Sequence, residues 1–429
     1  MPRRLAPSIA LMLPTLAGLL VAVPAAAQEA SPPATTTDAF AEIEAEYREL
    51  STYLMKRRGV GEGERQDLLA LRTRLDQFAL AHPDDPRPIA IDLQVALWLG
   101  EEDRVDAAFN RLIDLQPGNA AIRRRWAQAM MQANRWDEVV VVLDDATITA
   151  VPEALVDRAR ALMNLNRFAD ALSLLPANDA AAPAIASQVT ALRGQLEPLL
   201  ESWLAEEALV ASEAEANTLP RVRLETSKGP IVLELFEDQA PYTVANFIEL
   251  VGSGFYDGTT FHRVIPSFMA QGGDPNTKPG GSGAAGSGGP GYTIPDEGLR
   301  ADKRKHFAAR LAMAKPGDPA NPGKSKPNSA GSQFYLTVVP TPHLDAEYTV
   351  FGRIIEGDAA SRALRMDDVL LSATILRKRD HEYVPVKLGA STPATGTTPT
   401  SDTSASSTSP DATSTPSGDA GTSPSGAGG

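Results

Sequence analysis

The chain of 429 residues contains no cysteine. A thiol nucleophile, a disulfide framework and a thiolate metal site are therefore excluded. Histidine is also scarce, because the chain has five and none belongs to an H-E-x-x-H pair, so no metal site is expected. There is no excess of positive charge either, with 40 Lys and Arg against 54 Asp and Glu. Phosphate-backbone binding needs clustered cations, so we expect no nucleic-acid partner.

Two glycine-rich matches to nucleotide-binding patterns fail on their surroundings. GSGAAG at 281–286 fits G-x-G-x-x-G, but DPNTKPG before it and SGGPG after it supply neither the strand nor the helix of a dinucleotide site. GKS at 323–325 does not complete a phosphate loop, because Asp318 stands at the position of the first glycine. We therefore expect no cofactor.

The first 27 residues have the composition of a secretory signal. Arg3 and Arg4 form a positive segment, residues 9–23 are mainly apolar, and small residues end at Ala27. The apolar stretch is shorter than the ~20 residues of a spanning helix. We expect cleavage after Ala27, an exported chain in the periplasm or another extracytoplasmic space, and no membrane span in the mature chain. An uncleaved anchor is the alternative.

Residues 40–216, after a linker at 28–39, predict an all-helical domain. Its acidity is marked, since residues 28–219 hold 18 basic and 32 acidic side chains, a net charge of −14. DRVDAA, NRWDEV and NRFADA place Arg104, Arg135 and Arg167 31 and 32 residues apart. This spacing resembles the 34-residue period of tetratricopeptide helix pairs. Stacked pairs leave a concave face, where a protein partner could bind.

At residue 220 the pattern changes to short β-like runs that continue to 386. RVRLET and IVLELF flank a turn at SKGP, a helix is predicted from Pro241 with Gly252 at its C-cap, and further runs follow at FYLTVV, YTVFGRI and LLSATILRK. Many short strands with few helices predict a barrel or a sandwich. The final segment, 387–429, consists from Gly389 of Ala, Gly, Pro, Ser and Thr apart from three aspartates, which predicts a disordered tail. It would serve as a linker, a spacer or a glycan-bearing segment.

One stretch of the β-rich segment, FHRVIPSFMAQGGDP at 261–275, sets an arginine and a glutamine among apolar residues. LAMAK at 311–315, SAGSQFYLTV at 329–338 and TPHLDAEYTVFGRI at 341–354 follow it in order. With these motifs, residues of about 220–380 resemble the cyclophilins, which are peptidyl-prolyl cis-trans isomerases. The resemblance implies a closed antiparallel barrel of eight strands with two helices, so the whole chain is expected to be a multidomain α plus β protein.

The resemblance also implies a site, residue by residue. The catalytic residues fall on Arg263 and Gln271. The proline pocket falls on Phe268, Met269, Phe334, Tyr335 and Leu344. The groove for the substrate backbone falls on Ala314, Gln333, Gly286, His343, Tyr348 and His262. The implied substrates are proline-containing polypeptides, with no cofactor and no metal.

The chemistry explains these residue types. Rotation about an Xaa-Pro bond is opposed by amide resonance, with a barrier of ~18–20 kcal/mol. In the twisted transition state the prolyl nitrogen gains a lone pair, to which a guanidinium can donate a hydrogen bond that the planar ground state accepts poorly. Stabilisation specific to the transition state is what raises the rate. Arginine suits this task because it stays charged and its donors are rigidly placed.

The chain departs from the family pattern in three places. Residues 315–331 form a longer, proline-rich connection, which would either narrow substrate choice or project into solvent. Tyr335 stands where phenylalanine is common, and its hydroxyl needs a partner or water. His343 replaces a tryptophan of some members, which puts cyclosporin-type inhibition in doubt.

Two functions from different classes remain. The first is an exported isomerase that speeds the folding of exported proteins, with helical repeats that dock clients or a partner. The second is a non-catalytic protein that binds proline segments and acts mainly through its helical repeats as a scaffold or holdase.

Overall fold

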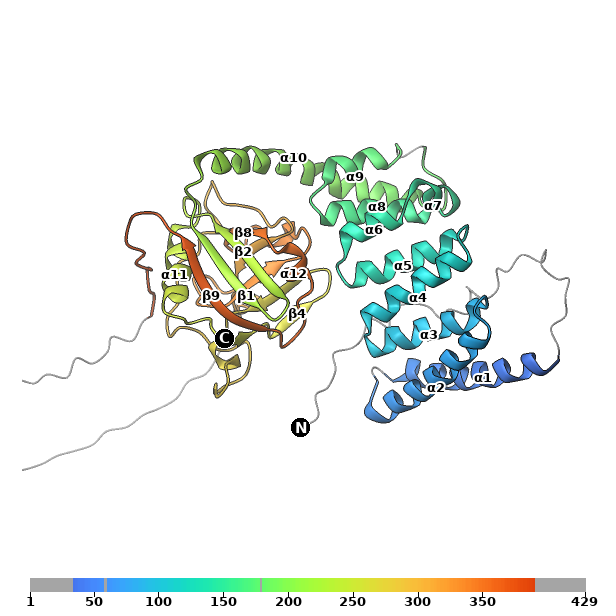
Figure 1. Cartoon of the computed structure of the whole chain (residues 1–429). Helices are drawn as coiled ribbons and strands as arrows, with labels where there is room; N and C mark the ends of the chain where they lie inside the picture. Colours follow the sequence, from blue (N-terminus) through green and yellow to red (C-terminus); the bar gives the residue numbers. More distant parts are fainter. Residues whose placement is uncertain (1–33, 58–59, 178–179, 390–429) are drawn as a thin grey trace, which may run out of the picture. The chain divides into compact units, whose positions relative to one another are not determined.

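The computed structural model describes residues 34–57, 60–177 and 180–389 (Figure 1). The chain divides into two units, Met1–Ala390 and Ser391–Gly429, and the second lies wholly outside these residues. The predicted signal segment and the tail from 390 onward also lie outside them, so both remain predictions.

The first part of the described chain is helical. It comprises α1 (Ala34–Lys56), α2 (Glu62–Ala81), α3 (Pro86–Leu99), α4 (Glu102–Leu115), α5 (Ala120–Gln132), α6 (Trp136–Val142), α7 (Asp145–Ala150), α8 (Glu153–Asn164), α9 (Phe168–Leu174) and α10 (Ala186–Ala216). Helix α1 begins at Ala34, inside the segment predicted as linker. None of the helices in the described ranges is both long and apolar enough to cross a membrane.

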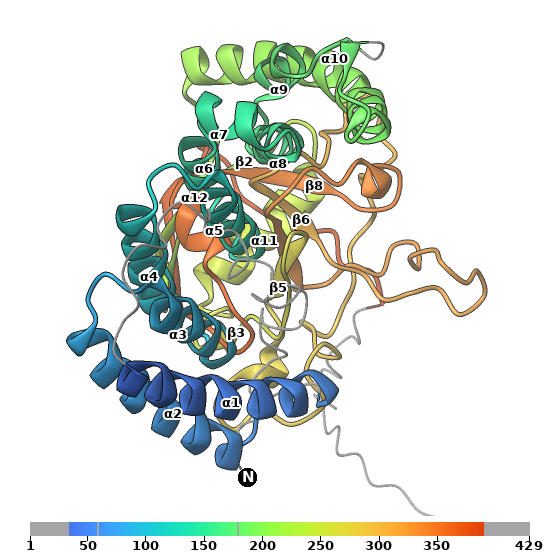
Figure 2. The same ribbon diagram turned by 90° about the vertical axis from the view of Figure 1, so that its right-hand side faces the viewer.

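Consecutive helices pack on one another, α2 on α3, α3 on α4, α5 on α6 and α8 on α9. Figure 2 shows α3, α4 and α5 as successive layers of this stack. The prediction of helix pairs is confirmed, whereas their tetratricopeptide identity stays a prediction.

The predicted register of the repeat was wrong in its first unit. Arg135 and Arg167 directly precede α6 and α9, but Arg104 lies inside α4. The residues that correspond in structure are Gly100, Asn134 and Asn166, which adopt left-handed backbone with φ of 70°, 61° and 59°. Each lies in the turn between two paired helices, and they are 34 and 32 residues apart. Glycine and asparagine tolerate this conformation at helix ends, so the turn rather than the arginine marks the repeat.

The second part is one antiparallel sheet with two helices. Its strands are β1 (Arg221–Thr226), β2 (Gly229–Leu235), β3 (Thr259–Thr260), β4 (Arg263–Ile265), β5 (Met269–Gly272), β6 (Arg310–Met313), β7 (Phe334–Thr337), β8 (Val350–Glu356) and β9 (Val369–Arg377). Their order is β3-β9-β1-β2-β8-β6-β7-β5-β4. The two end strands, β3 and β4, are separated only by Phe261 and His262, so the chain itself joins the edges of the sheet. They form one interrupted strand, which confirms the predicted closed barrel of eight strands.

Both helices of the second part pack against its strands. Helix α11 (Pro241–Gly252) packs Val244, Phe247 and Val251 into one large cluster with residues of the strands, and the short α12 (Asp358–Arg362) contacts β2. Proline begins α11 as predicted. Gly252 is still helical, however, and the left-handed glycine after α11 is Gly254, with φ of 66°. The predicted glycine C-cap was therefore wrong by two residues.

Polar and apolar contacts join α10 and its neighbours to the barrel. Phe307, 1% exposed, packs with Phe168 and Trp203 in the last helical cluster. Glu206 of α10 accepts hydrogen bonds from Arg304 Nε at 3.0 Å and from Arg310 Nη2 at 2.9 Å. All three of these charged side chains are buried. The helical part and the barrel therefore share an apolar core and a buried ion network.

Candidate active site

The β4–β5 hairpin places the two predicted catalytic residues side by side. Its register pairs Arg263 with Gln271, and Arg263 Nη1 donates to Gln271 Oε1 at 3.4 Å. Gln271 Nε2 in turn donates to Gln333 Oε1 at 3.0 Å. The Arg263 side chain is exposed at the surface, so its guanidinium is accessible to a bound chain. A cation and two amides thus form one line of donors and acceptors.

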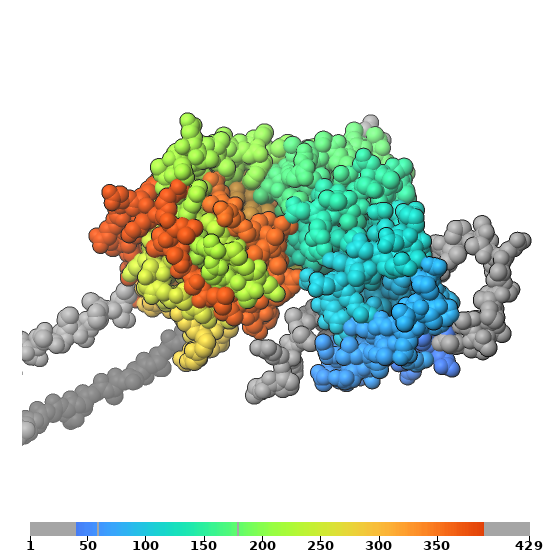
Figure 3. Space-filling view, viewed as in Figure 1, coloured from blue at the N-terminus to red at the C-terminus, as the bar shows by residue number. Residues whose placement is uncertain are grey.

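The glycine-rich loop extends this line. Gln333 Nε2 donates to the carbonyl oxygens of Gly286 at 3.0 Å and Gly288 at 2.8 Å. Behind the loop, the fully buried Asp274 accepts hydrogen bonds from the backbone of both glycines. The loop lies at the surface of the barrel (Figure 3). Sequence reasoning placed Asp274 in its motif, QGGD, without a role, and the structure assigns it the support of this loop.

Most of the predicted proline-pocket residues gather in one cluster on the outer face of the sheet. Met269 and Tyr335 are buried there, and Phe268 and Leu344 are partly buried against them. The cluster also includes Ala314 and Tyr348, both predicted for the groove, and further members are Leu219, Phe236, Ile265, Ala312 and Val350.

Phe334 is a correction to the predicted pocket. It is 0% exposed and packs in the barrel core against Phe247 and Tyr256. Successive residues of a strand point to opposite faces, so Phe334 and Tyr335 of β7 cannot both face the pocket. Sequence alternation within FYLT could have separated them.

The hydroxyl of Tyr335 has a partner within the protein. It lies 2.9 Å from His306 Nε2, while His306 Nδ1 lies 2.8 Å from Asp345 Oδ1. Asp345 Oδ1 also accepts from the His306 backbone N–H at 2.7 Å. Burial lowers the pKa of His306 and raises that of Tyr335, so the histidine is neutral and the phenol protonated at neutral pH. Sequence reasoning foresaw the need for a partner but missed both His306 and Asp345.

Three further predicted residues lie around the pocket and the loop. His343 is exposed and stacks on Phe268, with ring centroids 6.0 Å apart. Tyr348 meets the ring of Tyr335 edge-on at 6.0 Å. His262 is half-buried, and burial lowers its pKa. A Cβ on Gly286, which has φ of +87°, would lie 3.6 Å from the His262 ring, so the two residues are neighbours.

The long connection between β6 and β7 is held against the pocket rim. Ser325 N–H donates to Glu347 Oε2 at 2.9 Å, and Lys324 pairs with the same carboxylate at 2.7 Å. This pairing lowers the pKa of Glu347 to about 2. A cavity of about 280 Å³ lies between the connection, residues 296–299 and residues 346–347. Lys324 and Ser325 thus tie the connection to Glu347, whereas most of its other residues are exposed to solvent. Its effect on substrate choice stays a prediction.

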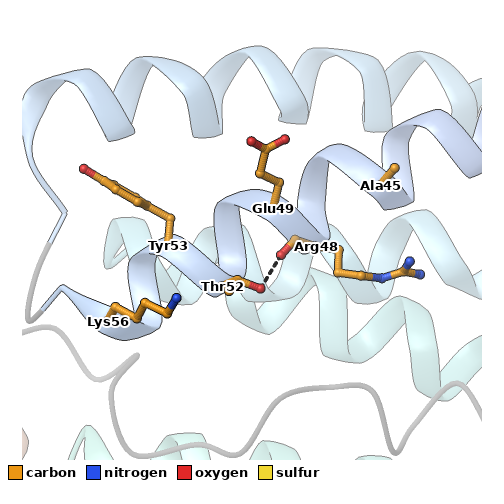
Figure 4. A pocket seen from close by; sticks show the side chains of 6 residues that line it. All are labelled: Ala45, Arg48, Glu49, Thr52, Tyr53 and Lys56. Atoms are coloured by element: carbon orange, nitrogen blue, oxygen red, sulfur yellow. Dashed lines mark hydrogen bonds between the residues drawn. The ribbon is translucent and has the colours of Figure 1, made fainter.

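A second hollow, of about 460 Å³, lies on the helical part (Figure 4). All its lining residues come from α1: Ala45, Arg48, Glu49, Thr52, Tyr53 and Lys56. The Thr52 hydroxyl donates to the carbonyl oxygen of Arg48 at 2.7 Å, a bond internal to the helix. No second element supplies a converging polar group, so we assign no chemistry to this hollow.

Comparison with known proteins identifies relatives of the barrel segment. Residues 221–376 match the family model described as cyclophilin type peptidyl-prolyl cis-trans isomerase/CLD. A peptidyl-prolyl cis-trans isomerase of Synechococcus elongatus is 44% identical over 155 residues, which cover 36% of this chain and 94% of the relative. Peptidyl-prolyl cis-trans isomerase B of Bacillus subtilis is 41% identical over 140 residues, 33% of this chain and 86% of the relative.

A solved cyclophilin type isomerase of Cryptosporidium parvum is similar as well, with 31% identity, a TM-score of 0.32, and coverage of 38% of this chain and 99% of that one. These similarities lie in about a third of the chain, and the family model places that third in the barrel. The chain belongs to the cyclophilin-type peptidyl-prolyl cis-trans isomerases, and its barrel carries that activity.

Proposed function

We propose that the chain accelerates Xaa-Pro isomerisation during the folding of exported proteins, with Arg263 as the catalytic cation. The uncatalysed step takes tens to hundreds of seconds, slow enough to limit folding. The observation that carries the proposal is the bonded line from Arg263 through Gln271 to Gln333, beside an apolar pocket.

In this mechanism the apolar pocket, Arg263 and Gln271 each have a separate role. The prolyl ring enters the pocket of Phe268, Met269 and Tyr335, where burial of its apolar surface holds it while the rest of the peptide rotates. Arg263 donates to the prolyl nitrogen as the amide twists and the nitrogen gains its lone pair. Gln271 bonds the backbone next to the proline and also orients the guanidinium. No covalent bond is broken, so no nucleophile is needed.

Substitution of Arg263 by alanine tests this mechanism. A charge-assisted hydrogen bond is worth ~1.5–3 kcal/mol, so we expect kcat/KM for a short Xaa-Pro peptide to fall by about one to two decades. Arg223→Ala is the matched control, because Arg223 is also an exposed strand arginine of the barrel. A loss of less than twofold in the Arg263 variant, in a protein with unchanged unfolding temperature, would contradict the proposed role.

Export is the second part of the proposal, and the composition of residues 1–27 supports it. When the full chain is expressed in a Gram-negative host, we expect periplasmic protein whose N-terminus is Gln28. Protein recovered only from the cytosol, with Met1 retained, would argue against export.

The helical repeats would hold a client or a partner protein. Their surface supports this, since Tyr53, Met55 and Val141 expose 47%, 51% and 77% of their area on an otherwise acidic region. The alternative function, as a scaffold or holdase, would depend on the helical repeats. It predicts protection of an unfolded client from aggregation that survives Arg263→Ala, whereas the folding-catalyst function predicts that client refolding slows with that substitution.

A further inference from the structure

Two asparagines of the helical part bond directly to the backbone of the barrel. Asn134 and Asn166 occupy the same place in consecutive repeats, the left-handed turn between paired helices. A left-handed residue is common at the end of a helix. The side chains of both asparagines bond to residues more than 100 positions later in the chain.

Asn134 holds the turn between β4 and β5. Its Oδ1 accepts a hydrogen bond from the backbone N–H of Ser267 at 2.9 Å. The asparagine is 4% exposed, and its own position is secured by Arg362, whose Nη1 donates to the Asn134 carbonyl at 3.1 Å. Asn134 Nδ2 donates to the Arg362 carbonyl at 3.3 Å. Ser267 itself has φ of 55°, an unfavourable conformation for serine, so an external hydrogen bond helps to retain it.

Asn166 holds the segment before β6 in the same way. Its Oδ1 accepts from the Ala308 N–H at 3.0 Å, and its Nδ2 donates to the Ala308 carbonyl at 3.2 Å. This two-bond pairing satisfies both backbone groups of one residue. Phe307, the preceding residue, is buried among the helices, which anchors the segment further.

Both bonded segments carry the proline pocket. Ser267 directly precedes Phe268 and Met269 in the turn that links the strands of Arg263 and Gln271. Ala308 follows His306 by two residues, and His306 bonds to the hydroxyl of Tyr335. The two asparagines therefore contact the backbone on both sides of the pocket, each within two residues of a group that forms or supports it.

We propose that Asn134 and Asn166 are positioning residues for the isomerase site, so that the helical repeats set the geometry of the proline pocket. The helical part then contributes to isomerase activity by positioning the pocket, in addition to any role in docking a client or partner. This inference rests on the isomerase activity of the family and is independent of export and of client binding.

The test compares the full-length variants Asn134→Gly, Asn166→Gly and the double variant. Glycine keeps the left-handed turn and removes only the side chain. The matched control is Asn217→Gly, because Asn217 also has left-handed backbone, with φ of 48°, and bonds to the barrel through Arg221 and Arg377, which lie outside the pocket cluster.

Two measurements separate positioning from general stability. Amide hydrogen exchange at Ser267 and Ala308 reports whether each bond is lost, and peptide isomerisation reports kcat and KM. We expect faster exchange at the matching amide, about a fivefold loss of kcat/KM per substitution, a larger loss in the double variant, and wild-type kinetics for Asn217→Gly.

The proposal is overturned if exchange accelerates while kcat/KM stays at the wild-type value. It is equally overturned if Asn217→Gly loses as much activity as the other two. If Asn134→Gly does not fold, Asn166→Gly decides the question alone, since the Asn166 side chain bonds to Ala308 and not to the Arg362 network.

Discussion

The helical part and the barrel assemble their cores in different ways. The helical core is a series of clusters whose members are near neighbours in sequence: one spans 40–99, the next 89–129, the third 126–165 and the last 140–203. The last two also contain one residue each from the barrel segment. The barrel has one large cluster that joins Val222 of β1 to Ala373 of β9. Repeat stacks gain stability one neighbour at a time, whereas a closed barrel must bring distant strands together. We therefore expect local damage to spread little in the helices and widely in the barrel.

The contrast between local packing in the helices and long-range packing in the barrel is weaker where the two parts meet. The last helical cluster contains Phe307, and the cluster before it is packed by Val339, both of which belong to the barrel segment. Ion pairs differ in burial along the chain. The Arg48–Glu44 pair of α1 is exposed, whereas Arg72 of α2 is buried and pairs with Asp92. Glu206 of α10 lies buried among arginines of the barrel. Exposed pairs contribute little to stability, and a buried charge without its partner is costly.

The largest predicted effect comes from a substitution that disrupts the core shared by the helical part and the barrel. Phe307→Ala removes a fully buried ring from between Phe168 and Trp203, and a Phe→Ala change in a core costs about 3–5 kcal/mol. We expect the free energy of unfolding to fall by that amount, measured by urea denaturation. Leu299→Ala is the control, since Leu299 is 76% exposed in the same segment. Equal stability of the two variants would mean that the helices and the barrel do not share a core.

A smaller effect is expected from Glu206→Gln. Burial pushes the pKa of Glu206 upward, but Arg310, Arg304 and Arg353 together hold it below its ordinary value, so the carboxylate is charged. Glutamine keeps one oxygen acceptor and removes the charge that offsets these buried cations, at a cost of about 1.5–3 kcal/mol.

Glu207→Gln is the matched control on the same helix, because Glu207 is exposed. Urea denaturation of the two variants measures the difference. A Glu206 variant as stable as the Glu207 variant would show that the buried network contributes nothing net.

The smallest effect concerns the pH dependence of the pocket. Because burial lowers the folded pKa of His306, the unfolded chain binds a proton more readily than the folded chain. The stability contributed by neutral His306 is therefore present above the ordinary histidine pKa of about 6.5 and is lost as pH falls below it through the lowered folded value.

Urea denaturation across this range should show a shallower decline with falling pH in His306→Gln than in the wild type. Leu299→Ala, which removes an exposed side chain without a titratable group, should leave the decline unchanged. Identical pH profiles for the wild type and His306→Gln would remove His306 from the account of acid sensitivity.

Much of the barrel site was predictable because its motifs are contiguous. Arg263, Phe268, Met269 and Gln271 lie within nine residues, and antiparallel pairing of two short strands places Arg263 beside Gln271. The failures have physical causes. Phe334 was assigned to the pocket although strand alternation turns it into the core. The repeat register was wrong because arginines at helix starts resemble one another in sequence, whereas the left-handed turn is a property of the backbone.

By itself, the amino-acid sequence determined the helical and β-rich division near residue 220 and the exclusion of thiol chemistry. Both follow from residue type and local periodicity, which act over a few residues. The site residues of the β4–β5 hairpin were assigned through the resemblance to the cyclophilins. Only the tertiary structure decided that His306 bonds the Tyr335 hydroxyl, that Glu206 neutralises arginines about 100 residues away, and that Asn134 bonds Ser267. Such contacts depend on which distant backbone and side-chain groups are buried together, and local sequence carries no record of that pairing.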